Sequence, residues 1–200
     1  MDISQAVRAS GAIPKEDVPA FLAALELPYS EWLLSEPHRE LKSLQGDFLR
    51  DIPTPYIKPD LSPFVPKRTV MVVNNSCDLP EGRTEFVTVA PALDFAGYLA
   101  AIKNRSSVAN RAKDLVQNRI TELLYVPRLQ GFSEGAIVRL DALCSVPKTV
   151  YRDAIDKGNR IASFTQSGFY FLLIKLTHHF ARIESHEVTR TGTNKEQRSL

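Results

Sequence analysis

The stretch Thr69-Val70-Met71-Val72-Val73 decides the fold, because it is an uncharged run of β-branched and apolar residues. Such a run is typical of a strand that is buried on both faces. A second run of this kind, Phe86-Val87-Thr88-Val89-Ala90, follows it, and we expect Pro91 to end that strand. Two buried strands so close together indicate a sheet with an apolar core.

A proline-rich connection precedes the first of these strands. Gly46-Asp47-Phe48-Leu49 begins a short extended segment. The prolines between residues 53 and 66 then restrict the backbone and exclude a helix. Asp47 either shapes the rim of a site or serves as a turn residue where the strand begins.

Strand and helix patterns also alternate after the two buried runs. Residues 94–124 have helical spacing of apolar side chains and predict an insertion of one helix or two. Residues 124–126 and 136–140 predict a hairpin with a long loop, and the apolar stretch 142–146 follows. Residues 44–184 therefore predict an α+β domain built on a small, curved, mostly antiparallel β-barrel.

The two ends of the chain differ from this central part. Residues 1–43 predict a helical appendage, with one helix after Pro14 and a second that Ser30 caps. Residues 168–182 carry a wide apolar face, which predicts a closing helix. Residues 185–200 are polar and predict a flexible tail.

Size and charge limit the classes of function. A chain of 200 residues, 44% of them hydrophobic, can form a core without a disulfide or metal. A net charge of +2 excludes a strongly cationic nucleic-acid coat but not a local basic patch. The longest apolar run, residues 169–174, is far shorter than the ~20 residues of a membrane span, and no secretory signal is visible. We therefore expect a cytoplasmic protein with no membrane partner.

Metal and cofactor motifs are not found in the sequence. Cys77 and Cys144 lie beside apolar runs, where a buried thiol is the commonest interpretation, and no zinc-type Cys/His spacing occurs. His178 and His179 are neighbours on a predicted helix, so they point about 100° apart and do not favour one metal. The chain has no Gly-rich phosphate loop and no nucleophile elbow. We expect no cofactor and no metal.

Four short motifs occur in a fixed order and together span about half of the chain: residues 45–49, 67–75, 87–92 and 135–146. This order resembles the PemK/MazF family of small SH3-like β-barrels, the toxins of bacterial toxin–antitoxin pairs. The resemblance implies an SH3-like barrel, a homodimer, and metal-independent cleavage of single-stranded RNA by attack of the ribose 2′-hydroxyl.

The resemblance also implies a set of site residues. In that family an arginine that opens the second strand and a threonine just after the third strand flank the scissile phosphate. Arg68 falls at the arginine position, and a guanidinium suits the role because it stays charged and can hold two phosphoryl oxygens. The threonine position falls at Leu93, which has no hydroxyl. Arg68 is thus the expected catalytic residue, and the expected substrate-binding residues beside it are Lys67, Asn74, Asn75, Ser76 and Asp78.

Structural explanations compete with these roles. An Asx turn, in which short polar side chains bond to their own backbone, accounts for residues 74–78 equally well. Basic residues at the start of a strand are often solvated edge charges. The stretch 103–119 carries five basic residues and one acid, a local charge of +4. Its Arg111 and Lys113 either follow an RNA backbone, grip an acidic partner, or face solvent on an amphipathic helix.

Two main functional hypotheses follow, and a third is nucleic-acid binding without cleavage, which predicts retention on RNA that weakens steeply as salt rises. The first is a PemK/MazF-like bacterial protein that acts on RNA as an endoribonuclease toxin. The second is a non-catalytic binding or regulatory module of a toxin–antitoxin or defence system. Under this second hypothesis the helical additions dock a protein partner, which is an antitoxin or a defence component. Leu93 favours it, because leucine lacks the hydroxyl of the family's threonine.

Overall fold

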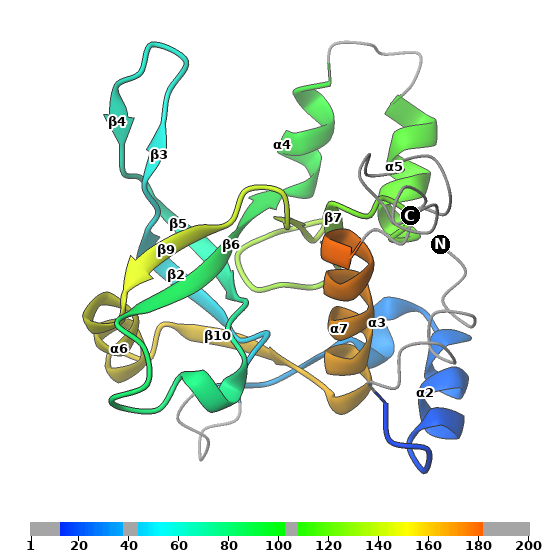
Figure 1. The fold of residues 1–200 in the computed structure, drawn as a ribbon. Helices are drawn as coiled ribbons and strands as arrows, with labels where there is room; N and C mark the ends of the chain where they lie inside the picture. Colours follow the sequence, from blue (N-terminus) through cyan, green and yellow to red (C-terminus); the bar gives the residue numbers. More distant parts are fainter. Residues whose placement is uncertain (1–12, 38–43, 103–107, 182–200) are drawn as a thin grey trace, which may run out of the picture.

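The computed structural model describes residues 13–37, 44–102 and 108–181 (Figure 1). The described strands are β1 (Leu34–Ser35), β2 (Phe48–Pro53), β3 (Tyr56–Ile57), β4 (Pro63–Phe64), β5 (Lys67–Val72), β6 (Phe86–Asp94), β7 (Leu123–Val126), β8 (Ala136–Arg139), β9 (Cys144–Pro147) and β10 (Arg160–Phe164). The described helices are α2 (Val18–Leu25), α3 (Tyr29–Trp32), α4 (Phe95–Ala100), α5 (Val108–Val116), α6 (Lys148–Asp156), α7 (Gln166–Ala181) and the short 3₁₀ helix η1 (Ser76–Asp78). The chain is therefore α+β, as predicted.

One antiparallel sheet organises these elements. Its strand order is β1-β10-β2-β5-β6-β8-β7, with β9 paired to β6 beside this path. Strands β3 and β4 form a separate two-stranded sheet. The helices α2, α3 and α7 gather on one side of the molecule, and the β3–β4 hairpin projects from another (Figure 1).

The central strand β5 is buried on both faces, as its sequence predicts. Val70, Met71 and Val72 are all fully buried. Met71 packs in a core cluster with α7 and the N-terminal helices, whereas Val70 and Val72 pack in a second cluster with Tyr151 of α6. Successive side chains of a strand point to opposite faces, so this one uncharged run contributes side chains to two core clusters.

The expectation that Pro91 ends the next strand was wrong. β6 continues through Pro91 to Asp94. On one side its neighbour changes from β9, which pairs with β6 up to Val89, to β8, which pairs from Ala92 onward. Pro91 falls between these two registers, where the missing N–H interrupts neither ladder.

The sheet does not close into a barrel. Its two end strands are β1 and β7, and the structure pairs neither with the other. A pocket of about 190 Å³, which residues of β1, of β10 and of the segment after β7 line, lies between the two edges. On β7 the backbone N–H and carbonyl of Tyr125 bond to the side chain of Asn118, at 2.7 and 3.1 Å. A side chain thus occupies the edge that closure would need.

Both ends of the described chain join one core. Phe21 of α2 contacts Trp32 of α3 and Tyr170 of α7, with ring centroids 6.4 and 6.1 Å apart. Ser30 is not an N-cap, because α3 starts one residue earlier, with Pro28 at the cap position. The predicted closing helix is confirmed as α7, and the segment 185–200 lies outside the described residues.

The insertion and the regions around it differ partly from expectation. The predicted helical insertion contains two α-helices in its described part, α4 and α5, and the predicted hairpin is confirmed as β7 and β8. The sequence patterns gave no signal for α6 and β10. No helix in the described ranges is long and apolar enough to cross a membrane.

Candidate functional site around Arg68

The proline-rich connection between β2 and β5 folds into the β3–β4 hairpin. Tyr56 pairs with Phe64 and Ile57 with Pro63. The backbone N–H of Lys58 donates to the Ser62 carbonyl at 3.0 Å and closes the turn. The hairpin is helix-free, as predicted, but the sequence analysis did not anticipate its strand pairing. The turn-forming residues 59–62 between two short apolar segments were the available signal.

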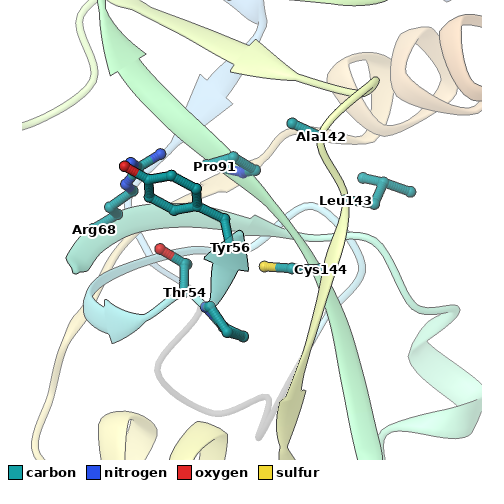
Figure 2. Close-up of a pocket in the computed structure, with 8 residues that line it drawn as sticks. Thr54, Tyr56, Arg68, Pro91, Ala142, Leu143 and Cys144 are labelled. Atoms are coloured by element: carbon teal, nitrogen blue, oxygen red, sulfur yellow. The ribbon is translucent and has the colours of Figure 1, made fainter. Parts of the chain in front are cut away.

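A pocket of about 540 Å³ opens at the base of this hairpin (Figure 2). It gathers side chains from segments that are distant in sequence: Thr54, Pro55, Tyr56, Arg68, Pro91, Ala142, Leu143 and Cys144. Figure 2 shows Tyr56 and Arg68 on one side of the pocket and Cys144 facing them from β9. The pocket therefore brings a cation, an aromatic ring and a thiol together.

The Arg68 guanidinium stacks against the aromatic ring of Tyr56. Its central carbon lies 5.2 Å from the ring centroid, which is within the range of a cation–π contact. Arg68 is half-buried, and it forms no ion pair with any acid of the described residues. Its charge is thus available to an anion that enters the pocket.

The thiol of Cys144 is only partly buried, whereas Cys77 is exposed. The expectation that both thiols are buried was therefore wrong for Cys77, which lies in η1 rather than in a strand. Burial raises the pKa of Cys144, and the nearby Arg68 charge lowers it by a smaller amount. A thiol with a raised pKa is mostly protonated at neutral pH and is a weak nucleophile.

The predicted polar turn at residues 74–78 has structural bonds. The Asn74 side-chain oxygen accepts from the Thr88 backbone N–H. The Asn75 side-chain oxygen accepts from the Cys77 N–H at 3.0 Å and caps η1. Ser76 accepts from the Gln45 N–H at 2.9 Å through its hydroxyl. Only the Asn75 bond is the local bond of an Asx turn, whereas Asn74 and Ser76 tie the turn to backbone groups 14 and 31 positions away in the chain.

The structure does not bring this turn to Arg68. Arg68 lies near the start of β5, and Asn74 follows the end of the same strand. Six residues of extended chain at about 3.3 Å each separate them by roughly 20 Å. Asn74, Asn75, Ser76 and Asp78 consequently do not line the Arg68 pocket.

The remaining predicted residues lie in other places. Lys67 is exposed beside Arg68 but does not line the pocket. Arg111 and Lys113 belong to α5, where Arg111 lies 4.0 Å from Glu122 and Lys113 is exposed. The predicted set therefore divides among the two ends of β5 and a helix of the insertion.

Leu93, at the threonine position implied by the resemblance, lines a different pocket of about 540 Å³. That pocket lies beside α4 and includes Tyr98 and Arg139. The Arg139 side chain binds both carboxylate oxygens of Asp141, at 2.6 and 2.7 Å, and this pairing lowers the pKa of Asp141. Leu93 and Arg68 thus do not share a pocket.

Of the eight residues that line this pocket, sequence reasoning predicted only Arg68 as a site residue, and Thr54 and Tyr56 are among those that it missed. Thr54 is buried, and its hydroxyl donates to the Pro66 carbonyl at 3.2 Å. Tyr56 is 41% exposed and presents its ring at the surface. An aromatic residue a short distance before a basic pair in the connection was the one local signal for it.

Comparisons of the chain with known proteins do not assign it to a family. No protein-family model matches the chain, and no curated protein matches its sequence at a significant level. In the parts of the chain that the structure describes, no three histidine, cysteine, aspartate or glutamate residues cluster as metal ligands. The Arg68 pocket is the site on which a function can be argued.

Proposed function

We propose that this chain binds single-stranded RNA at the Arg68 pocket, as a PemK/MazF-like protein whose sheet is an open variant of an SH3-like barrel. The stacked pair of Arg68 and Tyr56 at the mouth of the pocket carries the proposal. A guanidinium binds a phosphate through two parallel hydrogen bonds, and an exposed aromatic ring stacks on an unpaired base. The two groups together match one nucleotide of a single strand.

The charge around the pocket supports the same ligand. Residues 54–68 contain Lys58, Lys67 and Arg68 against Asp60, which gives three minus one, or +2. The Asp60 carboxylate accepts bonds from the Ser62 N–H at 2.9 Å and from the Ser62 hydroxyl at 2.7 Å. The Asp60 carboxylate is therefore used to close the turn, and the local excess of positive charge favours a ligand that supplies negative charge.

Two candidate functions are compatible with RNA binding at this pocket: cleavage of the bound RNA, and binding without cleavage. The position of Leu93 favours binding without cleavage. In the family that this chain resembles, a threonine hydroxyl works beside the arginine. Here that position carries an aliphatic side chain in a separate pocket. Incubation of single-stranded RNA with the protein in EDTA distinguishes the two candidates. Cleavage that Arg68→Ala abolishes indicates a metal-independent ribonuclease, and intact RNA indicates a binding module.

An equilibrium binding measurement tests the proposal itself. Arg68→Ala should weaken binding of a short fluorescent single-stranded RNA by about tenfold or more, because it removes a charged hydrogen-bond donor. Arg83→Ala is the matched control, because it removes the same charge from an exposed position between η1 and β6. Fluorescence anisotropy at one fixed salt concentration gives the dissociation constants. Equal constants for the wild type and Arg68→Ala would reject the proposal.

A further inference from the structure

Four side chains form a continuous row of contacts along one face of the β3–β4 hairpin, which we call the stacked face. The Arg68 guanidinium carbon lies 5.2 Å from the centroid of the Tyr56 ring. The Tyr56 and Phe64 ring centroids lie 5.3 Å apart, and the two rings meet edge to face at 83°. The Lys58 ammonium lies 4.8 Å from the Phe64 ring. A cation therefore lies at each end of an edge-to-face aromatic pair, and this row of side chains extends from the Arg68 pocket along the hairpin.

The hairpin has two chemically different faces. Tyr56 and Phe64 are cross-strand partners whose rings touch, so they share a face. Ile57 and Pro63 form the next pair and point to the opposite face, because side chains alternate along a strand. Tyr56 and Phe64 remain 41% and 42% exposed. Each ring therefore offers surface to a ligand on the stacked face.

We infer that this stacked face, formed by Arg68, Tyr56, Phe64 and Lys58, binds two consecutive unpaired bases of a single-stranded RNA. This inference rests on the proposed function and extends it from one nucleotide to two. One base stacks on Tyr56 and the next on Phe64, and because these rings are perpendicular the two bases are splayed apart rather than stacked on one another. The phosphates on either side of them bind Arg68 and Lys58. A duplex is excluded, because its base faces are already stacked on one another.

Charge on this face favours a nucleic acid over an apolar protein partner. Among the described residues neither Lys58 nor Arg68 forms an ion pair. An apolar partner that covered the rings would also cover these two cations and leave them without counter-charge. A single-stranded nucleic acid supplies base faces and phosphates together.

Fluorescence provides a direct test of stacking. Trp32 is the single tryptophan of the chain and is 7% exposed, so it contributes a constant background. In Phe64→Trp the new indole lies on the stacked face, and saturating single-stranded RNA should quench its emission. In the matched control Ile57→Trp the indole lies on the opposite face, and the same RNA should leave its emission unchanged. Equal quenching of both variants, or of neither, would overturn the inference.

Affinity measurements separate this inference from the proposed function. Phe64→Ala should weaken binding of single-stranded RNA about tenfold and leave the binding of inorganic polyphosphate, which has no bases, unchanged. Ile57→Ala should change neither affinity. Wild-type affinity for RNA in Phe64→Ala, together with a loss in Arg68→Ala, would refute the stacking arm and leave the proposed function standing. No loss in either variant would refute both.

Discussion

Asp47 is a residue whose role depends on partners far away in the sequence. It is fully buried, and its carboxylate accepts from the Arg160 guanidinium at 3.0 Å, the Ser163 hydroxyl at 2.6 Å and the Leu44 N–H at 3.0 Å. Arg160 and Ser163 lie 113 and 116 positions later in the chain. The sequence pattern indicated a turn or a site rim, because no local signal reveals a buried ion pair.

Removing this charge should cost stability. Asp47→Asn keeps the size of the side chain but removes the charge that faces Arg160, so the free energy of unfolding should fall by about 3 kcal/mol. Asp153→Asn breaks the exposed ion pair with Lys157 and is the control, with an expected change within about 0.5 kcal/mol. Urea unfolding measures both values. Similar losses in the two variants would show that the Asp47 pair adds nothing beyond a surface pair.

Strands and helices could be predicted where the apolar pattern of one continuous segment was enough to identify the element. The uncharged run at residues 69–73 predicted β5, and the apolar spacing in residues 168–182 predicted α7. β10 could not be predicted in this way, because it is short and two of its five residues, Arg160 and Ser163, are polar and bind the Asp47 carboxylate. The local patterns also could not predict that the sheet stays open, since this depends on the Asn118 side chain that binds the edge of β7.

The edge of β7 makes a prediction at the scale of the element. Asn118 has a positive φ of 52°, which glycine also adopts, so Asn118→Gly removes the side chain without backbone strain. The two bonds to Tyr125 are then lost, and the free energy of unfolding should fall by about 2 kcal/mol. An unprotected edge should also promote self-association.

Asn118→Asp provides the matched control. It keeps an acceptor for the Tyr125 N–H but loses the donor to the Tyr125 carbonyl, so its stability should lie between those of the wild type and Asn118→Gly. Urea unfolding and analytical ultracentrifugation measure stability and association. A monomeric Asn118→Gly with wild-type stability would contradict the role of Asn118 as an edge cap.

At the scale of the whole molecule, the Arg68 site and the stabilising core occupy different regions. The pocket and the hairpin stand at one end of β5. The N-terminal helices, α7 and the inner face of the sheet share a core that does not include Arg68. The order of sequence motifs predicted Arg68 as a site residue, whereas the positions of its neighbours Tyr56 and Cys144 depend on how β3 and β9 pack around β5. Changes in the pocket should therefore affect ligand binding more than folding.

Lys175 links the stability of the whole molecule to pH. It is buried in α7, where its ammonium group donates to the backbone carbonyls of Asn118 and Ile120. Burial lowers its pKa to about 7, and the charge of Glu122 opposes this effect only in part. Between pH 7 and the unfolded value of 10.5 the unfolded chain holds a proton at this site that the folded chain has released. The free energy of unfolding should therefore rise with pH across this window.

The size of this rise with pH can be measured by comparison with a variant that has no titrating group at position 175. Relative to Lys175→Met, the wild type should gain up to about 1.4 kcal/mol per pH unit between pH 7 and 10, and nothing below pH 6. The tyrosines and cysteines that titrate in the same window are present in both proteins and cancel in the difference. Lys157→Met removes an exposed lysine instead and should follow the wild-type pH dependence. Parallel curves for the wild type and Lys175→Met would mean that Lys175 stays charged when folded, since only a buried neutral amine produces a difference that grows with pH.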